Sequence, residues 1–187
     1  CRDLYGVEEF TDASMPRLMA AMRKRVKTGW TRAVFDKAGI DFAMAHRFGP
    51  KLCYNASEDP ATFIADMVAS FMELPIEQLA AESGMPIGSL ADYLKIIERH
   101  FALYAREAGA LKVGVAYVRT LYFRDVPRAE AEPVFNRLLR SKVRPAAEEL
   151  RPLEDFLMHT IFRLCGEYDL TVKVHTGIQE GIGNILS

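Results

Sequence analysis

Two apolar runs decide the fold: "ALKVGVAYVRTLYF" at 110–123 and "LTVKVHTG" at 170–177. The first is rich in β-branched and aromatic residues and is apolar at nearly every position, which is typical of a strand covered on both faces. The segment 128–169 between the runs contains prolines at 133, 145 and 152, and it predicts two or three helices. Two buried strands joined by helices predict a parallel pair with a right-handed crossover, and therefore an α/β fold.

The residues before this pair are predicted to be mainly helical. Apolar residues recur at helical spacing, and Thr11 or Asp12, Pro16 and Ser89 provide start signals, while Gly39 and Gly109 provide stop signals. Helices are predicted over 11–26, 30–38, 61–73, 76–83 and 87–109. The short run "IDFAMAHR" at 40–47 fits either a buried strand or the start of a helix.

Composition narrows the class of protein. The chain has 187 residues, of which 50% are hydrophobic and 26% charged, as in an ordinary globular domain. A formal net charge of -1 provides no basic field for nucleic acid or for an anionic membrane. Three scattered cysteines predict no disulfide framework, and no apolar stretch reaches the roughly 18 residues of a membrane span. We therefore expect a soluble cytoplasmic protein without a nucleic-acid or membrane partner.

Candidate site residues stand near the ends of the two predicted strands. Ligands of parallel α/β folds bind beyond the carboxyl ends of the strands. His175 ends the second run, Arg119 lies close to the end of the first, and Tyr117 shares its parity, so both would point to one side. Arg119 could hold a substrate carboxylate or form a salt bridge, and His175 could serve the site or be a structural residue. His46 follows a third run and could reach the same place.

The segments "GALKVGVAYVRTL", "LEDFLMHTIFRLCGEYDL" and "VKVHTGIQEGIGN" together resemble the amidohydrolase superfamily. "RDLYGVEEF" at 2–10 and "GWTRAVFDKAGIDFAM" at 29–44 resemble the same branch, the metal-dependent hydrolases and decarboxylases related to uronate isomerase. The resemblance implies part of a (β/α)₈ TIM barrel with a large helical insertion. It divides the chain into 1–109, with the insertion and early barrel elements, and 110–187, with barrel strands and the metal-site histidine. The chain would then be an internal piece of a longer protein.

The resemblance also implies a divalent metal, zinc or manganese, with His175 as a ligand and its other ring nitrogen held by a second partner. The other ligands would include an HxH pair and an aspartate on a later strand, but the sequence contains no HxH, and none of its aspartates follows His175. In some members a lysine bridges two metals. We expect Lys112 not to do so, because it lies near the start of its predicted strand, seven residues before Arg119, and thus roughly 20 Å from the carboxyl end at about 3.3 Å per residue.

The implied enzyme hydrolyses or decarboxylates a small carboxylate- or amide-containing substrate through a metal-activated water. Arg119, Tyr117 and Glu180 would contact the substrate, with Gln179 and Asn184 in the same polar loop. A sugar-acid isomerase similar to uronate isomerase is an alternative. A metal-free structural or interaction module, with eight methionines contributing to a partner surface, is another, and a homo-oligomer remains open.

Overall fold

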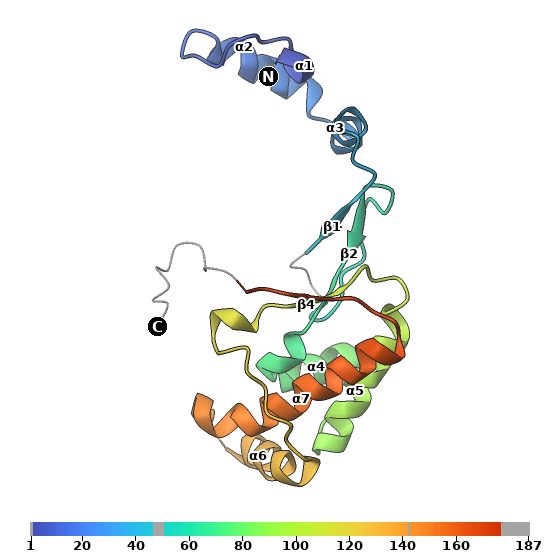
Figure 1. Cartoon of the computed structure of the whole chain (residues 1–187), viewed down its shortest axis with the longest axis vertical. Coiled ribbons are helices and arrows are strands. Elements are labelled where there is room, and N and C mark those ends of the chain that lie inside the picture. Colours follow the sequence, from blue (N-terminus) through green and yellow to red (C-terminus); the bar gives the residue numbers. More distant parts are fainter. Residues whose placement is uncertain (1, 47–50, 142, 177–187) are drawn as a thin grey trace. The chain divides into compact units, whose positions relative to one another are not determined.

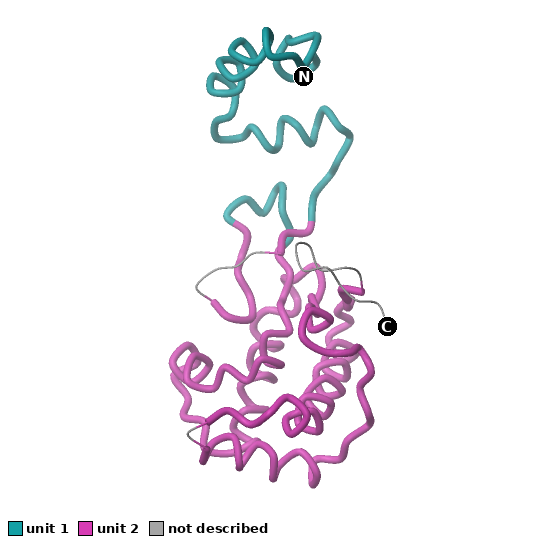
Figure 2. Tube along the Cα trace, turned by 90° about the vertical axis from the view of Figure 1, so that its left-hand side faces the viewer, with its two compact units in different colours: residues 1–43, 58–64 teal, residues 44–57, 65–187 magenta. Residues whose placement is uncertain are grey.

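The computed structural model describes residues 2–46, 51–141 and 143–176. Its α-helices are α1 (Arg2–Tyr5), α2 (Met15–Arg25), α3 (Trp30–Ala38), α4 (Ile76–Ser83), α5 (Leu90–Tyr104), α6 (Arg128–Arg140) and α7 (Ala147–Glu167) (Figure 1). Its strands are β1 (Ala43–Ala45), β2 (Phe63–Ala65), β3 (Met67–Val68), β4 (Leu111–Val113) and β5 (Val172–Val174). Two short 3-10 helices are η1 (Ser70–Glu73) and η2 (Val115–Tyr117). The chain divides into two compact units, residues 1–43 with 58–64, and residues 44–57 with 65–187 (Figure 2).

Unit 2 is built on a parallel sheet with the strand order β3-β4-β5. The register pairs Leu111 with Val172 and Lys112 with Lys173, and Met67 pairs with Leu111 on the other side. The predicted parallel pairing of the two apolar runs is therefore confirmed. The described strands form sheets of two and three strands, so the closed eight-stranded barrel stays a prediction.

The core of unit 2 joins this sheet to the helices. Figure 1 shows α4, α5 and α7 together on one side of β4. The buried residues Met67, Leu111 and Val113 of the sheet belong to one apolar cluster with residues of α5 and α7. Side chains alternate between the two faces of a strand, so Lys112, between two buried residues, points to the opposite face. The sheet thus has an apolar face toward the helices and a polar face.

Unit 1 has a much smaller core. Arg32 ties α3 to the following segment, because its guanidinium donates to the carbonyls of Ile40 and Asp41 at 2.6 Å. The rings of Tyr5 and Trp30 lie 5.5 Å apart, and Gly39 ends α3 with a positive φ of 69°, as its sequence position predicts. No residue of α3 is buried. Unit 1 is therefore stabilised mainly by local contacts.

The predicted helix over 61–73 is wrong. This segment forms β2, β3 and η1 instead. Its apolar residues fit the helical period, but a short apolar run fits a buried strand as well. Pairing with β4 decides between the two, since the amides of Met67 and Ala69 donate to the carbonyls of Ala110 and Lys112 at 2.9 Å.

The predicted strand over 110–123 is too long. Strand β4 ends at Val113, and the chain turns at Gly114 into η2. The last hydrogen bond of the pairing joins the amide of His175 to the carbonyl of Val113, at 2.9 Å. The neighbouring strands contain only two and three residues, so there is no partner for a longer β4. The parity argument for Tyr117 and Arg119 is therefore wrong, because neither residue lies in a strand.

The other predicted helices are confirmed in outline. Helices α2, α3 and α4 occur where the sequence predicts them, and 128–169 contains two helices, α6 and α7. Helix α5 begins after Ser89 as predicted but ends at Tyr104 rather than near Gly109. The run at 40–47 contains strand β1, so the interpretation of this run as a strand, and not as the start of a helix, is confirmed. Among the described residues, every helix is too short or too polar to span a membrane.

Candidate functional site

A cavity of about 760 Å³ lies beyond the carboxyl ends of β3 and β4. Residues that directly follow these strands line it, among them Ala69 and Ser70 after β3, and Gly114 and Val115 after β4. The loops before α7 and after β1 complete the wall. The carboxyl ends of parallel strands are where α/β folds bind their ligands, so this cavity is the candidate site.

Tyr117 and His175 meet at this end of the sheet. The hydroxyl of Tyr117 lies 3.3 Å from Nδ1 of His175, and the two ring centroids are 4.4 Å apart. Tyr117 also lines the cavity. Nε2 of His175 is buried, and within the described part of the chain it has no hydrogen-bond partner. His175 therefore has one nitrogen held by a neighbour and one whose lone pair or proton is unused within the described part of the chain.

A second group of polar residues lies on the polar face of the sheet. Lys112 and Lys173 are register partners on β4 and β5. Lys173 forms an ion pair with Asp66, which precedes β3 and is only 2% exposed. The second carboxylate oxygen of Asp66, Oδ1, is buried without a hydrogen-bond partner among the described residues. A buried charge is costly unless it is paired, and Lys173 supplies the charge of opposite sign beside Asp66.

His46 lies within electrostatic reach of the same group. Burial lowers the pKa of His46, and the charges of Lys112 and Lys173 lower it further, while the charge of Asp66 opposes them. The imidazole of His46 is therefore neutral at neutral pH. His46 also lines the cavity, which links the polar face of the sheet to the candidate site.

Lys112 lies nearer to the carboxyl end of its strand than the sequence predicts. The expected strand runs on to residue 123, whereas β4 ends one residue after Lys112. Lys112 thus stands near the carboxyl end of its strand. It belongs with His46, Asp66 and Lys173 among the residues that could serve the site.

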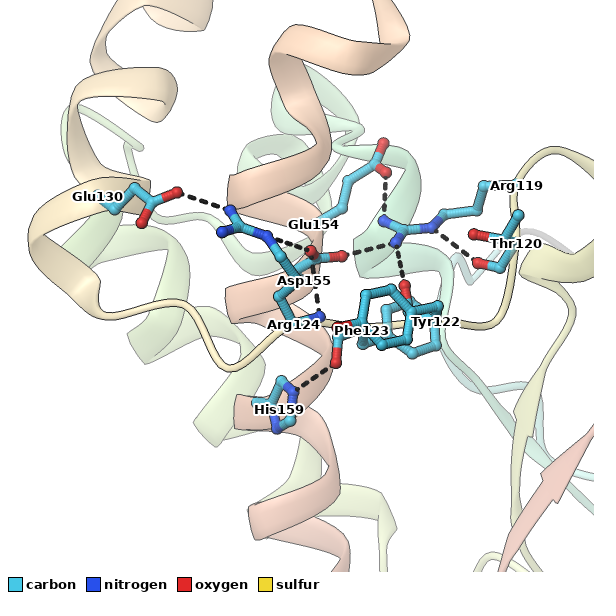
Figure 3. A network of polar contacts seen from close by, with 9 residues as sticks. All are labelled: Arg119, Thr120, Tyr122, Phe123, Arg124, Glu130, Glu154, Asp155 and His159. Atoms are coloured by element: carbon cyan, nitrogen blue, oxygen red, sulfur yellow. Dashed lines mark hydrogen bonds and ion pairs between the residues drawn. The ribbon is translucent and has the colours of Figure 1, made fainter.

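Arg119 is held by helix α7 (Figure 3). Its guanidinium contacts Glu154 at 2.7 Å and Asp155 at 2.6 Å, and it also donates to the carbonyl of Tyr122 at 3.0 Å. The side chains of Arg119 and Asp155 are 6% and 1% exposed. Nε donates to the carbonyl of Thr120 at 3.2 Å. The guanidinium of Arg119, one of whose expected roles was to hold a substrate carboxylate, is therefore occupied by two carboxylates of the protein. The salt-bridge alternative is confirmed.

The loop after η2 is fastened to α7 by the same contacts. Asp155 also accepts a hydrogen bond from the backbone amide of Arg124 at 3.3 Å, and His159 contacts the carbonyl of Phe123 at 3.3 Å (Figure 3). The guanidinium of Arg119 lies 4.5 Å from the ring centroid of Phe123. Arg119 contributes to the cavity wall, but its polar atoms serve this loop.

The structure thus brings together part of the predicted site. Tyr117 and His175 are in contact, whereas Arg119 is directed to α7. Glu180, Gln179 and Asn184 lie outside the described residues. Sequence reasoning missed Asp66 and Lys173. An aspartate inside the apolar run "FIADMV" was the available signal, but only the strand register places it beside Lys173.

The described residues do not assemble a complete metal site. Nowhere in 2–46, 51–141 or 143–176 do three or more histidine, cysteine, aspartate or glutamate side chains gather as a metal ion would require. Catalytic zinc takes three protein ligands and keeps one position open. His175, with its buried and unused Nε2, fits the role of one such ligand. The remaining ligands are not supplied by the part of the chain that the structure describes.

Comparison with known proteins adds a similarity of fold. No family model matches the sequence, and no curated protein matches it. Among solved structures, the crystal structure of a "putative metal-dependent hydrolase" from Lactobacillus casei resembles this chain with a TM-score of 0.61 and 17% sequence identity. The match covers 94% of this chain and 46% of that protein, so the chain spans about half of its length. At this identity the likeness shows a shared fold alone.

Proposed function

We propose that this chain is part of a hydrolase that depends on a divalent metal ion, zinc or manganese, and that His175 is one of the metal ligands. The fold shared with the Lactobacillus casei protein supports the class of enzyme. The site supports it independently, because His175 stands at the carboxyl end of a parallel strand beside a cavity-lining tyrosine.

The observation that carries the proposal is the difference between the two ring nitrogens of His175, of which one contacts Tyr117 and the other has no partner among the described residues. A histidine that binds a metal through one nitrogen commonly donates its other N–H to a nearby oxygen, which fixes the tautomer and the orientation of the ring. Here Nδ1 faces the hydroxyl of Tyr117, and the buried Nε2 has no partner among the described residues. If Nε2 binds the metal, Nδ1 carries the proton and donates a hydrogen bond to the hydroxyl oxygen of Tyr117.

This arrangement makes Tyr117 a positioning residue rather than a substrate contact alone. The tilted contact between the two rings and the hydrogen bond hold the imidazole in one orientation, and the turn at η2 holds the tyrosine. The cavity, at about 760 Å³, is large enough for a small carboxylate- or amide-containing substrate. Glu180 remains a predicted substrate contact of the polar loop that follows His175.

The test is the metal content of the protein encoded by the complete reading frame. We expect one or two equivalents of zinc or manganese by mass spectrometry, together with hydrolysis of a small ester or amide. His175→Ala should lower metal occupancy and abolish most turnover, and Tyr117→Phe should weaken metal binding by about tenfold or more. His159→Ala on α7 is the matched control and should retain the metal.

Three outcomes separate the alternatives. Full metal occupancy in the His175→Ala variant would contradict the assignment of this ligand. Isomerisation of a uronate without net hydrolysis would select the sugar-acid isomerase. A protein that contains no metal and turns over none of these substrates would select the structural or interaction module.

A further inference from the structure

The candidate cavity carries an excess of positive charge. Four cationic side chains line it, against the two carboxylates of Glu73 and Glu154. The cationic residues are Lys51, Arg119, Arg144 and Arg151. The chain as a whole has a formal charge of -1, so this local excess differs in sign from the average. A concave surface of one sign raises the local concentration of ligands of the opposite sign.

Not all of these charges are available to a ligand. Arg119 and Glu154 neutralise each other at 2.7 Å. Lys51 donates to the hydroxyl of Tyr104 at 3.1 Å and lies 4.9 Å from the centre of its ring. Within the described residues, however, no carboxylate pairs with Arg144 or Arg151.

Arg144 and Arg151 both line the cavity and lie seven residues apart, in α7 and in the loop before it. Arg144 lies in the loop between α6 and α7, and its guanidinium donates to the backbone carbonyl of Glu73 at 3.0 Å. That contact fixes the side chain without neutralising its charge, because a carbonyl is neutral. Arg151 lies in the second turn of α7. Both side chains face the cavity and are otherwise exposed.

The acidic start of α7 does not cancel this pair. Glu149 accepts a hydrogen bond from the amide of Ala146 at 3.1 Å and forms an ion pair with Arg137 at 2.8 Å. It is thus used as the cap of the helix. Glu148, the other acidic residue of this turn, is exposed, and among the described residues it forms no ion pair with either arginine. Glu73, which lines the cavity, is likewise exposed to solvent.

The rest of the wall includes the apolar side chains of Leu52, Val68, Met72, Val115 and Val118, and the polar side chains of Asn55, Ser70 and Tyr117. The five apolar side chains suit the carbon skeleton of a ligand. Arginine recognises carboxylate and phosphate alike through its planar fork, which can donate two parallel hydrogen bonds. The two arginines favour an anionic group, and the apolar side chains favour a carbon skeleton, so the wall suits a ligand that has both.

We infer that the cavity takes a small molecule with an apolar skeleton and one carboxylate or phosphate group, which Arg144 and Arg151 hold. This inference rests on the proposed function, since it names the substrate class of the same cavity. It also assigns the anchoring of the anion to α7 and the loop before it, in place of Arg119. A sugar acid, with a hydroxyl on nearly every carbon, offers little apolar surface to the five apolar side chains of this wall.

Isothermal titration calorimetry at low salt, on the protein encoded by the complete reading frame, tests the inference directly. The probes are benzoate and phenyl phosphate, with glucuronate and benzamide for comparison. Benzoate, phenyl phosphate or both should bind, and the probe that binds more tightly shows whether the site prefers a carboxylate or a phosphate. Glucuronate should bind at least about tenfold more weakly, and benzamide should show no binding. Equal binding of benzamide, or tighter binding of glucuronate, would overturn the inference.

Variants connect the binding to the two arginines. Arg144→Gln and Arg151→Gln should each weaken binding of the preferred anion by about tenfold, and Arg151→Lys by less, because lysine keeps the charge but loses the fork. Arg163→Gln is the matched control, since Arg163 lies on the same helix in an exposed pair with Glu167. Unchanged affinity in both glutamine variants would overturn the inference.

The same proteins distinguish this inference from the proposed function. Metal occupancy of the complete protein should not change in Arg144→Gln or Arg151→Gln. If the complete protein binds metal and hydrolyses its substrate but none of the anions binds, the inference fails and the function stands. If the anions bind as expected but His175→Ala leaves metal occupancy and turnover unchanged, the assignment of the ligand fails and the anion site stands.

Discussion

Asp155 is the residue on which the loop after β4 depends. Its carboxylate is 1% exposed and accepts from Arg119 at 2.6 Å and from the backbone amide of Arg124 at 3.3 Å. Asp155→Ala would leave the buried guanidinium with Glu154 as its remaining carboxylate partner. We expect a loss of about 3 kcal/mol in the free energy of unfolding, the lower end for a broken buried pair, measured by urea denaturation.

The control for Asp155 lies farther along the same helix. Glu167→Ala removes an exposed pair with Arg163, and it should cost only about 0.3–0.5 kcal/mol. An equal effect of the two substitutions on stability would show that the loop is not held by Asp155.

His100 makes stability depend on pH. Its side chain is 8% exposed, and its ring packs against Phe71 and Tyr104. Burial lowers the pKa of His100 below its ordinary value of 6.5. The unfolded chain therefore binds a proton more readily than the folded chain, so stability falls as the pH falls below 6.5.

His100→Phe should reduce this acid dependence. We expect a smaller difference in unfolding free energy between pH 7.5 and pH 5.5 for the variant than for the wild type, measured by chemical denaturation. His46, whose pKa is also lowered by burial, should leave a residual slope. An unchanged slope would mean that His100 does not contribute to it.

At the scale of elements, the start of α5 is the clearest case of local control. The hydroxyl of Ser89 accepts a hydrogen bond from the amide of Asp92, as expected of a cap. Ser89→Ala should destabilise the protein by about 1 kcal/mol, and Ser89→Asp should retain most of the stability, both measured by thermal unfolding. A loss in Ser89→Asp as large as in Ser89→Ala would contradict the capping role.

The helices could be predicted from the sequence because their signals are local. Ser89 correctly marks the start of α5, and Gly39 correctly marks the end of α3. The strands could not be bounded in this way. Strand β4 ends where its neighbours end, and β3 exists because its amides find carbonyls of β4. Both facts depend on partners distant in the sequence, which a pattern of apolar residues does not contain.

The same distinction explains the site. Tyr117 and His175 are each expected near the carboxyl ends of the parallel pair, but their contact depends on the turn at Gly114 into η2, which a strand over 110–123 does not contain. The role of Arg119 could not be predicted, because it depends on Glu154 and Asp155, 35 and 36 residues away. The pairing of Lys173 with Asp66 spans 107 residues and needs the sheet register.

At the scale of the whole molecule, the two units should differ in stability. Among the described residues of unit 1 only Val7, Leu18 and Thr62 are buried, whereas α7 alone buries eight residues. A segment with so few buried apolar contacts opens readily. Amide hydrogen exchange should therefore be fast in α2 and α3 and slow in α5 and α7. Protection of α3 equal to that of α7 would show that unit 1 is covered by a further surface.

The central claim is that His175 binds a metal through Nε2 while Tyr117 holds Nδ1. Anomalous diffraction at the zinc edge, from crystals of the protein encoded by the complete reading frame and grown with zinc, tests it most directly. We predict an anomalous peak about 2.0–2.1 Å from Nε2 of His175, with the hydroxyl of Tyr117 still in hydrogen-bonding distance of Nδ1. A peak bound by other residues, with Nε2 of His175 engaged elsewhere, would contradict the claim.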